Sequence, residues 1–107
     1  MHIGIGFTPF ETRADTIVQL AVQADDAGLG RVSVAEGWTN DAFILLAEMA
    51  LRTSRIELGT GVVSVWGRSP ATLAMAATGL QRAAHGRFSL GLGAGSPPLA
   101  EGLHGIE

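Results

Sequence analysis

The sequence contains no cysteine, few charged residues and no long apolar run. Without cysteine, the 107-residue chain has no disulfide, thiolate metal site or catalytic thiol. Seven basic against ten acidic residues give a formal net charge of -3, which argues against a nucleic-acid partner. No apolar stretch approaches the roughly 20 residues that a membrane span needs, so we expect no membrane segment.

The N-terminal sequence also lacks the basic segment and long apolar core of a signal peptide, which favours a cytoplasmic location. The three histidines, His2, His85 and His104, have no metal-ligand spacing, so we expect no metal site. Hydrophobic residues make up 47% of the chain, which is more than a free-standing domain of this size needs. The composition indicates part of a larger fold, or a subunit that hides surface in an oligomer.

Four segments alternate bulky residues with small ones, which is the period of a β-strand. They are residues 2–7, 31–35, 56–62 and 87–94. In a sheet covered by helices on both faces, both faces should be bulky. One bulky and one bare face instead favour helices on the outside and a crowded or ligand-filled interior.

Three helices are expected between these strands. Thr12 is the expected N-cap of the first, with Asp15 completing a capping box, and Gly28 is its expected left-handed C-terminal cap. The second runs over residues 42–52 after an Asn40 or Asp41 N-cap and is apolar on most sides. The third runs over residues 70–84, with Ser69 as N-cap and Pro70 in its first turn.

Alternating strands and helices imply parallel strands joined by crossover helices. Two architectures fit, an open doubly wound sheet and part of a (β/α)8 barrel, which takes about 250 residues. The one-sided bulk favours the barrel. We therefore predict an α/β fold in which residues 1–107 form a single domain, a partial barrel of about the first four strands and three helices, with the strands in sequential order.

The third strand and the segment after it, Arg55 to Pro70, are the centre of this prediction. Ile56, Leu58, Thr60 and Val62 form one bulky face, whereas the other face carries two glycines. A strand face without side chains lets a flat group approach the backbone. The run from Gly91 to Gly95 invites a dinucleotide-binding interpretation, but its G-x-G-x-G spacing on a fourth strand matches the G-x-G-x-x-G fingerprint poorly.

Four pieces of the chain together resemble the luciferase-like monooxygenase superfamily. They are Val34-Ala-Glu-Gly-Trp38, Leu58-Gly-Thr-Gly-Val62, Arg68-Ser-Pro70 and the run from Gly86 to Gly95. The resemblance implies a (β/α)8 barrel that binds FMN or the deazaflavin coenzyme F420 at the carboxyl ends of its strands and acts on a small-molecule substrate. The ending Gly91 to Pro98 is more similar to the F420-dependent branch than to the FMN-dependent monooxygenases.

The resemblance also implies roles for individual residues. Gly61-Val62 matches the site of a non-prolyl cis peptide that backs the cofactor ring, and contacts to the cofactor are expected from Thr60, Gly61, Val62, Gly93 and Ala94. Glu36 matches an acidic position near the cofactor and is the catalytic candidate. A solvated carboxylate at a strand end is the alternative for Glu36.

The chain departs from the superfamily at two positions. Gly37 stands where many members have a histidine, and Ser96 stands where the sugar-phosphate dehydrogenases have a glutamate. These departures keep a non-catalytic half-barrel that assembles with itself as an alternative to an enzyme. A homodimer through the second and third helices is expected in either case. Phe43, Ile44 and Leu51 lie outside the apolar stripe of the second helix, and the third has almost no charge before Arg82.

Overall fold

A four-stranded parallel sheet with helices along one face organises the chain. The computed structural model describes residues 2–94 and 98–105. Within these residues, the sheet has the order β1-β2-β3-β5, formed by β1 (Gly4–Phe7), β2 (Arg31–Val34), β3 (Glu57–Thr60) and β5 (Phe88–Ser89). All three pairings are parallel, so the predicted sequential order is confirmed and a doubly wound order is not found.

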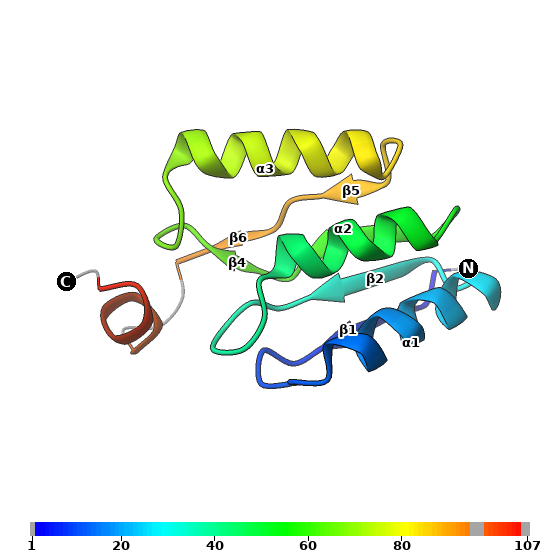
Figure 1. Ribbon diagram of the computed structural model, residues 1–107, viewed down its shortest axis with the longest axis horizontal. Helices are drawn as coiled ribbons and strands as arrows, with labels where there is room; N and C mark the ends of the chain where they lie inside the picture. Colours follow the sequence, from blue (N-terminus) through cyan, green and yellow to red (C-terminus); the bar gives the residue numbers. More distant parts are fainter. Residues whose placement is uncertain (1, 95–97, 106–107) are drawn as a thin grey trace.

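Three α-helices run along this sheet, as Figure 1 shows. They are α1 (Ala14–Asp26), α2 (Ala42–Arg52) and α3 (Pro70–Ala83). Ile5, Val32, Leu58 and Phe88 align across the strands and pack against these helices. The opposite face carries the aligned row Gly6, Ser33, Gly59 and Ser89. The predicted contrast between a bulky and a bare face is therefore present.

The third and fourth strands each continue beyond a break. β4 (Val63–Ser64) and β6 (Leu92–Gly93) form a second parallel pair. Leu58 pairs with Phe88 and Val63 pairs with Leu92. The third strand therefore advances five residues between these two pairs, whereas the fourth advances four. This extra residue is a β-bulge, and it reverses the faces of the third strand. The predicted alternation is wrong beyond Thr60, because Val62 is 43% exposed and Val63 is fully buried.

The helix boundaries follow local signals with one exception. Asp41 is the N-cap of α2 and accepts hydrogen bonds from the backbone N–H groups of Phe43 and Ile44, at 2.9 and 3.2 Å. Ser69 caps α3 as predicted, by accepting from the N–H of Thr72 at 3.1 Å, and Pro70 opens the helix. Gly28 has the expected positive φ of 83° after α1.

The predicted capping box at the start of α1 is wrong. The N-cap is Arg13, and no side chain caps this helix. Thr12 instead uses its carbonyl oxygen to accept from the N–H of Ala14 at 3.0 Å. The carboxylate of Glu11 binds both the backbone N–H and the guanidinium of Arg13, at 3.0 and 2.7 Å. A charged pair outside the helix has therefore replaced the Thr12–Asp15 pattern.

Asp25 in the last turn of α1 is a buried carboxylate that the helical pattern did not single out. It is 5% exposed and accepts from the backbone N–H groups of Ser54, Arg55 and Ile56, at 3.0, 2.9 and 2.8 Å. Burial alone would raise the pKa of Asp25, but these three hydrogen bonds outweigh burial and hold the pKa below its ordinary value. The carboxylate thus ties α1 to the residues that lead into β3.

Candidate functional site

The carboxyl ends of the parallel strands meet at one end of the sheet, and most of the predicted site residues lie there. The N–H of Glu36 donates to the carbonyl of Val62 at 3.1 Å, and the N–H of Gly61 donates to the carbonyl of Val34 at 2.9 Å. These bonds join the end of β2 to the Gly61–Val62 segment. The peptide bond between Gly61 and Val62 is cis, as the resemblance implied.

Gly93 and Ala94 extend the same end of the sheet on the neighbouring strand. The N–H of Val65 donates to the carbonyl of Gly93 at 2.9 Å, and the indole N–H of Trp66 donates to the carbonyl of Ala94, also at 2.9 Å. Gly61, Val62, Gly93 and Ala94 therefore belong to two adjacent strand ends. The π-helical turn η1 (Pro98–Leu103) lies beyond these ends in Figure 1.

The surface between these strand ends is nearly free of side chains. Gly61 is exposed, and a Cβ atom placed there would meet nothing closer than Cβ of Ser33 at 3.5 Å. A Cβ atom at Gly6 would come no closer than 3.7 Å to the carbonyl oxygen of Ser33. We call Gly6, Ser33 and Gly61 the small-residue platform. Such a surface suits the close approach of a planar ring, because none of the three platform residues has a side chain larger than that of serine.

The bare face does not continue toward the amino ends of the strands. The guanidinium of Arg31 lies over Gly59 and occupies the space that a side chain at Gly59 would need. Arg31 also donates to the hydroxyl of Ser33 at 3.4 Å and lies 3.9 Å from the carboxylate of Glu57. The expectation that the third strand is bare along its whole length is therefore wrong at Gly59, and the open part begins at Gly61.

Thr60 lies on the opposite face of the strand from this platform. Its side chain is 3% exposed, and its hydroxyl both donates to the carbonyl of Gly91 at 2.8 Å and accepts from the N–H of Gly91 at 2.7 Å. A Cβ atom at Gly91 would collide with the backbone carbonyl of Thr60. Close packing of two strands therefore explains Gly91 without a dinucleotide.

Glu36 is held by two partners rather than free at its strand end. Its carboxylate forms a two-point ion pair with Arg68, at 2.8 and 2.9 Å, and accepts from the N–H of Ala42 at 2.8 Å. Arg68 also binds Asp41 at 2.9 Å and lies 4.8 Å over the ring of Phe43. The hydrogen bonds to Glu36 raise the pKa of Arg68 despite its partial burial. These contacts join β2, the start of α2 and the segment before α3.

The motif Arg68-Ser-Pro70 contains Arg68, but the sequence pattern did not identify Arg68 as the partner of Glu36. An arginine beside a helix start in a nearly uncharged segment was the available signal. Gly37 has a structural reason too, because a Cβ atom there would lie 2.6 Å from Cβ of Pro9. A larger residue at Gly37 would therefore require Pro9 to move.

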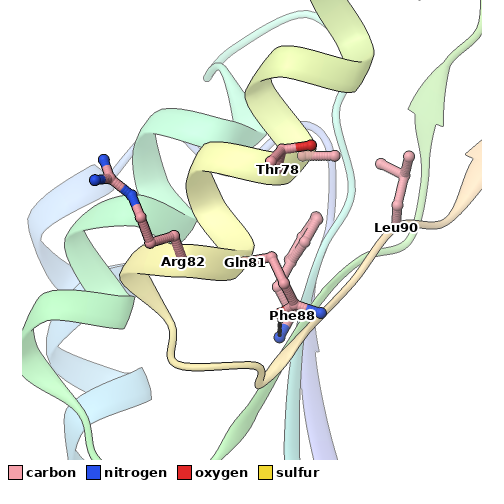
Figure 2. Close-up of a pocket in the computed structure, with 6 residues that line it drawn as sticks. Thr78, Gln81, Arg82, Phe88 and Leu90 are labelled. Carbon is pink, nitrogen blue, oxygen red and sulfur yellow. Dashed lines mark hydrogen bonds between the residues drawn. The ribbon is translucent and has the colours of Figure 1, made fainter.

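One cavity adjoins these residues, and a larger one lies elsewhere along the sheet. One of about 270 Å³ adjoins the ion pair and includes Trp38, which is 48% exposed, and His104. A larger one of about 520 Å³ lies between α3 and the edge strand β5, lined by Thr78, Gln81, Phe88 and Leu90 as Figure 2 shows. The larger cavity lies away from the carboxyl ends of the strands. Only the smaller of these two cavities adjoins the candidate site.

Three further findings concern the described residues, metal ligands and membrane spans. Ser96 lies outside the described residues, as does Gly95. Among residues 2–94 and 98–105, no group of His, Asp and Glu side chains is arranged to hold a metal ion. In the same part of the chain, no helix has the length and apolar character required to cross a membrane.

Comparison with known proteins adds relatives that are much longer. A Mycobacterium tuberculosis protein provisionally named a coenzyme F420-dependent oxidoreductase is 41% identical over 87 residues, which are 81% of this chain and 25% of that protein. The 3,6-diketocamphane 1,6-monooxygenase of Pseudomonas putida is 34% identical over 120 residues, covering 100% of this chain and 32% of the enzyme. The chain thus spans about a quarter to a third of the length of these curated relatives.

Solved structures show the same fold. The oxygenating constituent of Pseudomonas putida 3,6-diketocamphane monooxygenase, in complex with FMN, gives a TM-score of 0.87 at 29% identity over 99% of this chain and 33% of that one. The coenzyme F420-dependent tetrahydromethanopterin reductase of Methanopyrus kandleri gives 0.85 at 24% identity over 95% of this chain and 29% of that one. The chain therefore has the fold of part of a luciferase-like (β/α)8 barrel. The family model of the luciferase-like monooxygenases matches residues 1–107, and the chain belongs to this family.

Proposed function

We propose that the protein is an oxidoreductase that transfers a hydride between a small-molecule substrate and coenzyme F420. The observation that carries this proposal is the small-residue platform of Gly6, Ser33 and Gly61 at the carboxyl ends of the strands. Family membership supports a flavin or deazaflavin as the group that lies on it. The described residues would be the N-terminal half of the barrel, and the remaining strands would come from additional chain.

The residues present define what this half contributes. Gly61, Val62, Gly93 and Ala94 would support one face of the cofactor ring through their backbone and small side chains. The bound cofactor supplies the hydride-accepting carbon. Arg68 holds Glu36 in an ion pair, and Glu36 also accepts from the N–H of Ala42. Glu36 would therefore keep the end of β2 and the start of α2 in place beside the ring. Trp38 is exposed enough to contact a substrate in the adjoining cavity.

FMN-dependent monooxygenation is the second candidate. The Pseudomonas relative, whose solved structure contains FMN, supports this candidate. The higher identity to the Mycobacterium protein and the sequence Gly91 to Pro98 favour F420. A non-catalytic half-barrel remains the alternative from another class, and it predicts that neither cofactor binds.

Fluorescence titration of the purified protein with F420 and with FMN tests these candidates. We expect tighter binding of F420. Gly61→Leu should weaken binding of either cofactor, because the added side chain has room to fold and would cover the platform. Gly79→Leu is the matched control, since Gly79 lies on α3 with nothing within 4 Å of an added Cβ atom. Tighter FMN binding would move the protein to the monooxygenases, and equal effects of both substitutions would contradict the platform.

We further propose that the protein forms a homodimer through α2 and α3. Ile44 and Leu51 on α2 are 69% and 77% exposed, and Met75 on α3 is 69% exposed. Phe43 is not part of this surface, because it is 7% exposed and packs against Phe88 with ring centroids 6.1 Å apart. Neighbouring exposed apolar side chains are typical of an interaction surface, and a two-fold contact would use the same surface twice.

A further inference from the structure

The bulge in the third strand leaves a gap in the strand pairing around Gly61 of the platform. The β3·β5 pairing ends at Gly59 and Ser89, and the β4·β6 pairing begins at Val63 and Leu92. Bulges are rare in parallel pairs, and they often lie next to active sites, where they redirect side chains. Backbone groups inside the gap need other partners, because a buried unpaired N–H or C=O group is unfavourable.

The side chain of Thr60 bonds to backbone groups inside this gap. Its hydroxyl accepts from the N–H of Gly91 at 2.7 Å and donates to the carbonyl of Gly91 at 2.8 Å. That carbonyl also accepts from the N–H of Val63 at 3.1 Å, on the far side of the bulge. One hydroxyl therefore bonds to both polar groups of the residue that faces the bulge.

The backbones of Thr60 and Gly91 also lie close together. Gly91 has no room for a side chain, because a Cβ atom would collide with the carbonyl oxygen of Thr60. Gly61 and Val62 follow Thr60 directly, so their height above the sheet depends on how Thr60 is held. The hydroxyl itself is buried on the opposite face from Gly61 and does not reach the platform.

We propose that Thr60 is a positioning residue, which holds Gly61 and Val62 against the cofactor ring by binding Gly91 and does not itself contact the cofactor. This role rests on the proposed function. It differs from the contact that the resemblance implied for Thr60. It also distinguishes threonine from valine of nearly equal shape, because only the hydroxyl can both donate and accept.

Three variants test the role on the full protein. Thr60→Val keeps the shape and removes the hydroxyl, and Thr60→Ser keeps a hydroxyl. Val18→Ala destabilises the core at the fully buried Val18 of α1, which is not one of the strand-end residues. We expect Thr60→Val to weaken binding of the preferred cofactor by about tenfold, because binding would then have to order Gly61 and Val62, which the Thr60 hydroxyl holds in place beforehand in the wild type. Thr60→Ser and Val18→Ala should bind as the wild type does.

Amide hydrogen exchange without cofactor gives an independent measurement. The N–H of Gly91 depends on the Thr60 hydroxyl, so Thr60→Val should speed its exchange by about tenfold, whereas Thr60→Ser should not. Should Thr60→Val not fold, Thr60→Cys gives the same comparison with a weaker donor and acceptor.

The outcomes are distinguishable. Faster Gly91 exchange and weaker binding in Thr60→Val, both reversed in Thr60→Ser, would support the role. Two outcomes would overturn the role and leave the proposed function standing. In the first, the wild type binds cofactor and Thr60→Val binds it with the same affinity. In the second, Val18→Ala weakens cofactor binding as much as Thr60→Val does. A wild-type protein that binds neither F420 nor FMN would refute the proposed function, and this role with it.

Discussion

Replacing Asp25 by alanine should destabilise the protein more than replacing an exposed helical aspartate would, because Asp25 is buried. The carboxylate accepts from three consecutive backbone N–H groups, of Ser54, Arg55 and Ile56, which lead into β3. Alanine leaves all three without this partner. Asparagine keeps one carbonyl oxygen, which can still accept from Arg55 and Ile56 at the position of Oδ1.

The expected magnitude follows from the burial of each group. The hydrogen bond from the N–H of Ile56 is buried, and leaving that group unpaired costs about 1–3 kcal/mol. Those of Ser54 and Arg55 are half-buried and can rebind water, so losing each bond costs about 0.5–1.5 kcal/mol. The sum for Asp25→Ala is roughly 2–6 kcal/mol of unfolding free energy, and Asp25→Asn should cost roughly half of that.

The pH dependence has a definite sign. Because the pKa of Asp25 is lowered in the folded protein, the carboxylate stabilises the fold at pH values above 3.8, its ordinary pKa. This stabilisation is lost as the pH falls below that value and through the folded pKa. Asp25→Asn should therefore lose less stability than the wild type over the same acid range.

Urea unfolding of the purified variants, followed by circular dichroism, measures these differences. Asp26→Ala is the matched control, because the neighbouring Asp26 is exposed and surface substitutions of this kind change stability by about 0.5 kcal/mol or less. The reasoning is refuted if Asp25→Ala and Asp26→Ala are equally stable at pH 7. An acid transition of Asp25→Asn identical to that of the wild type would refute the linkage alone.

Two further predictions concern assembly and the ion pair. Substituting both Ile44 and Leu51 by Asp should convert the proposed dimer to monomers in light scattering, because carboxylates would meet their copies in a dry contact; a monomeric wild type or an unchanged variant would show that α2 faces something else. Glu36→Gln should lower the melting temperature, because Arg68 would lose one of its two charged partners while remaining partly buried and would keep only Asp41. It should leave the pH profile of turnover unchanged in shape, whereas loss of one limb of that profile would identify Glu36 as an acid or base.

The sequence by itself determined the alternation of four strand segments with three α-helices, because their signals are local, but it did not predict the breaks before β4 and β6 or the turn η1. Alternation over 4–8 residues predicts a strand wherever a sheet supplies one buried face. The caps at Asp41 and Ser69 are likewise decided within a few residues, and α2 has the predicted bounds. The small residues of the platform were also visible in the sequence, since each of Gly6, Ser33 and Gly61 stands on the bare face of its own predicted strand.

The tertiary structure decided which of these residues face one another. The bulge after Thr60 depends on how two strands far apart in the sequence pair, so periodicity along one strand could not reveal that Val63 rather than Val62 is buried. Arg31 covers Gly59 because two strands place them side by side. Glu36 and Arg68, 32 positions apart, meet only when β2 and the segment before α3 end at the same edge. Periodicity and capping act between near neighbours, whereas these contacts are set by the packing of the whole sheet.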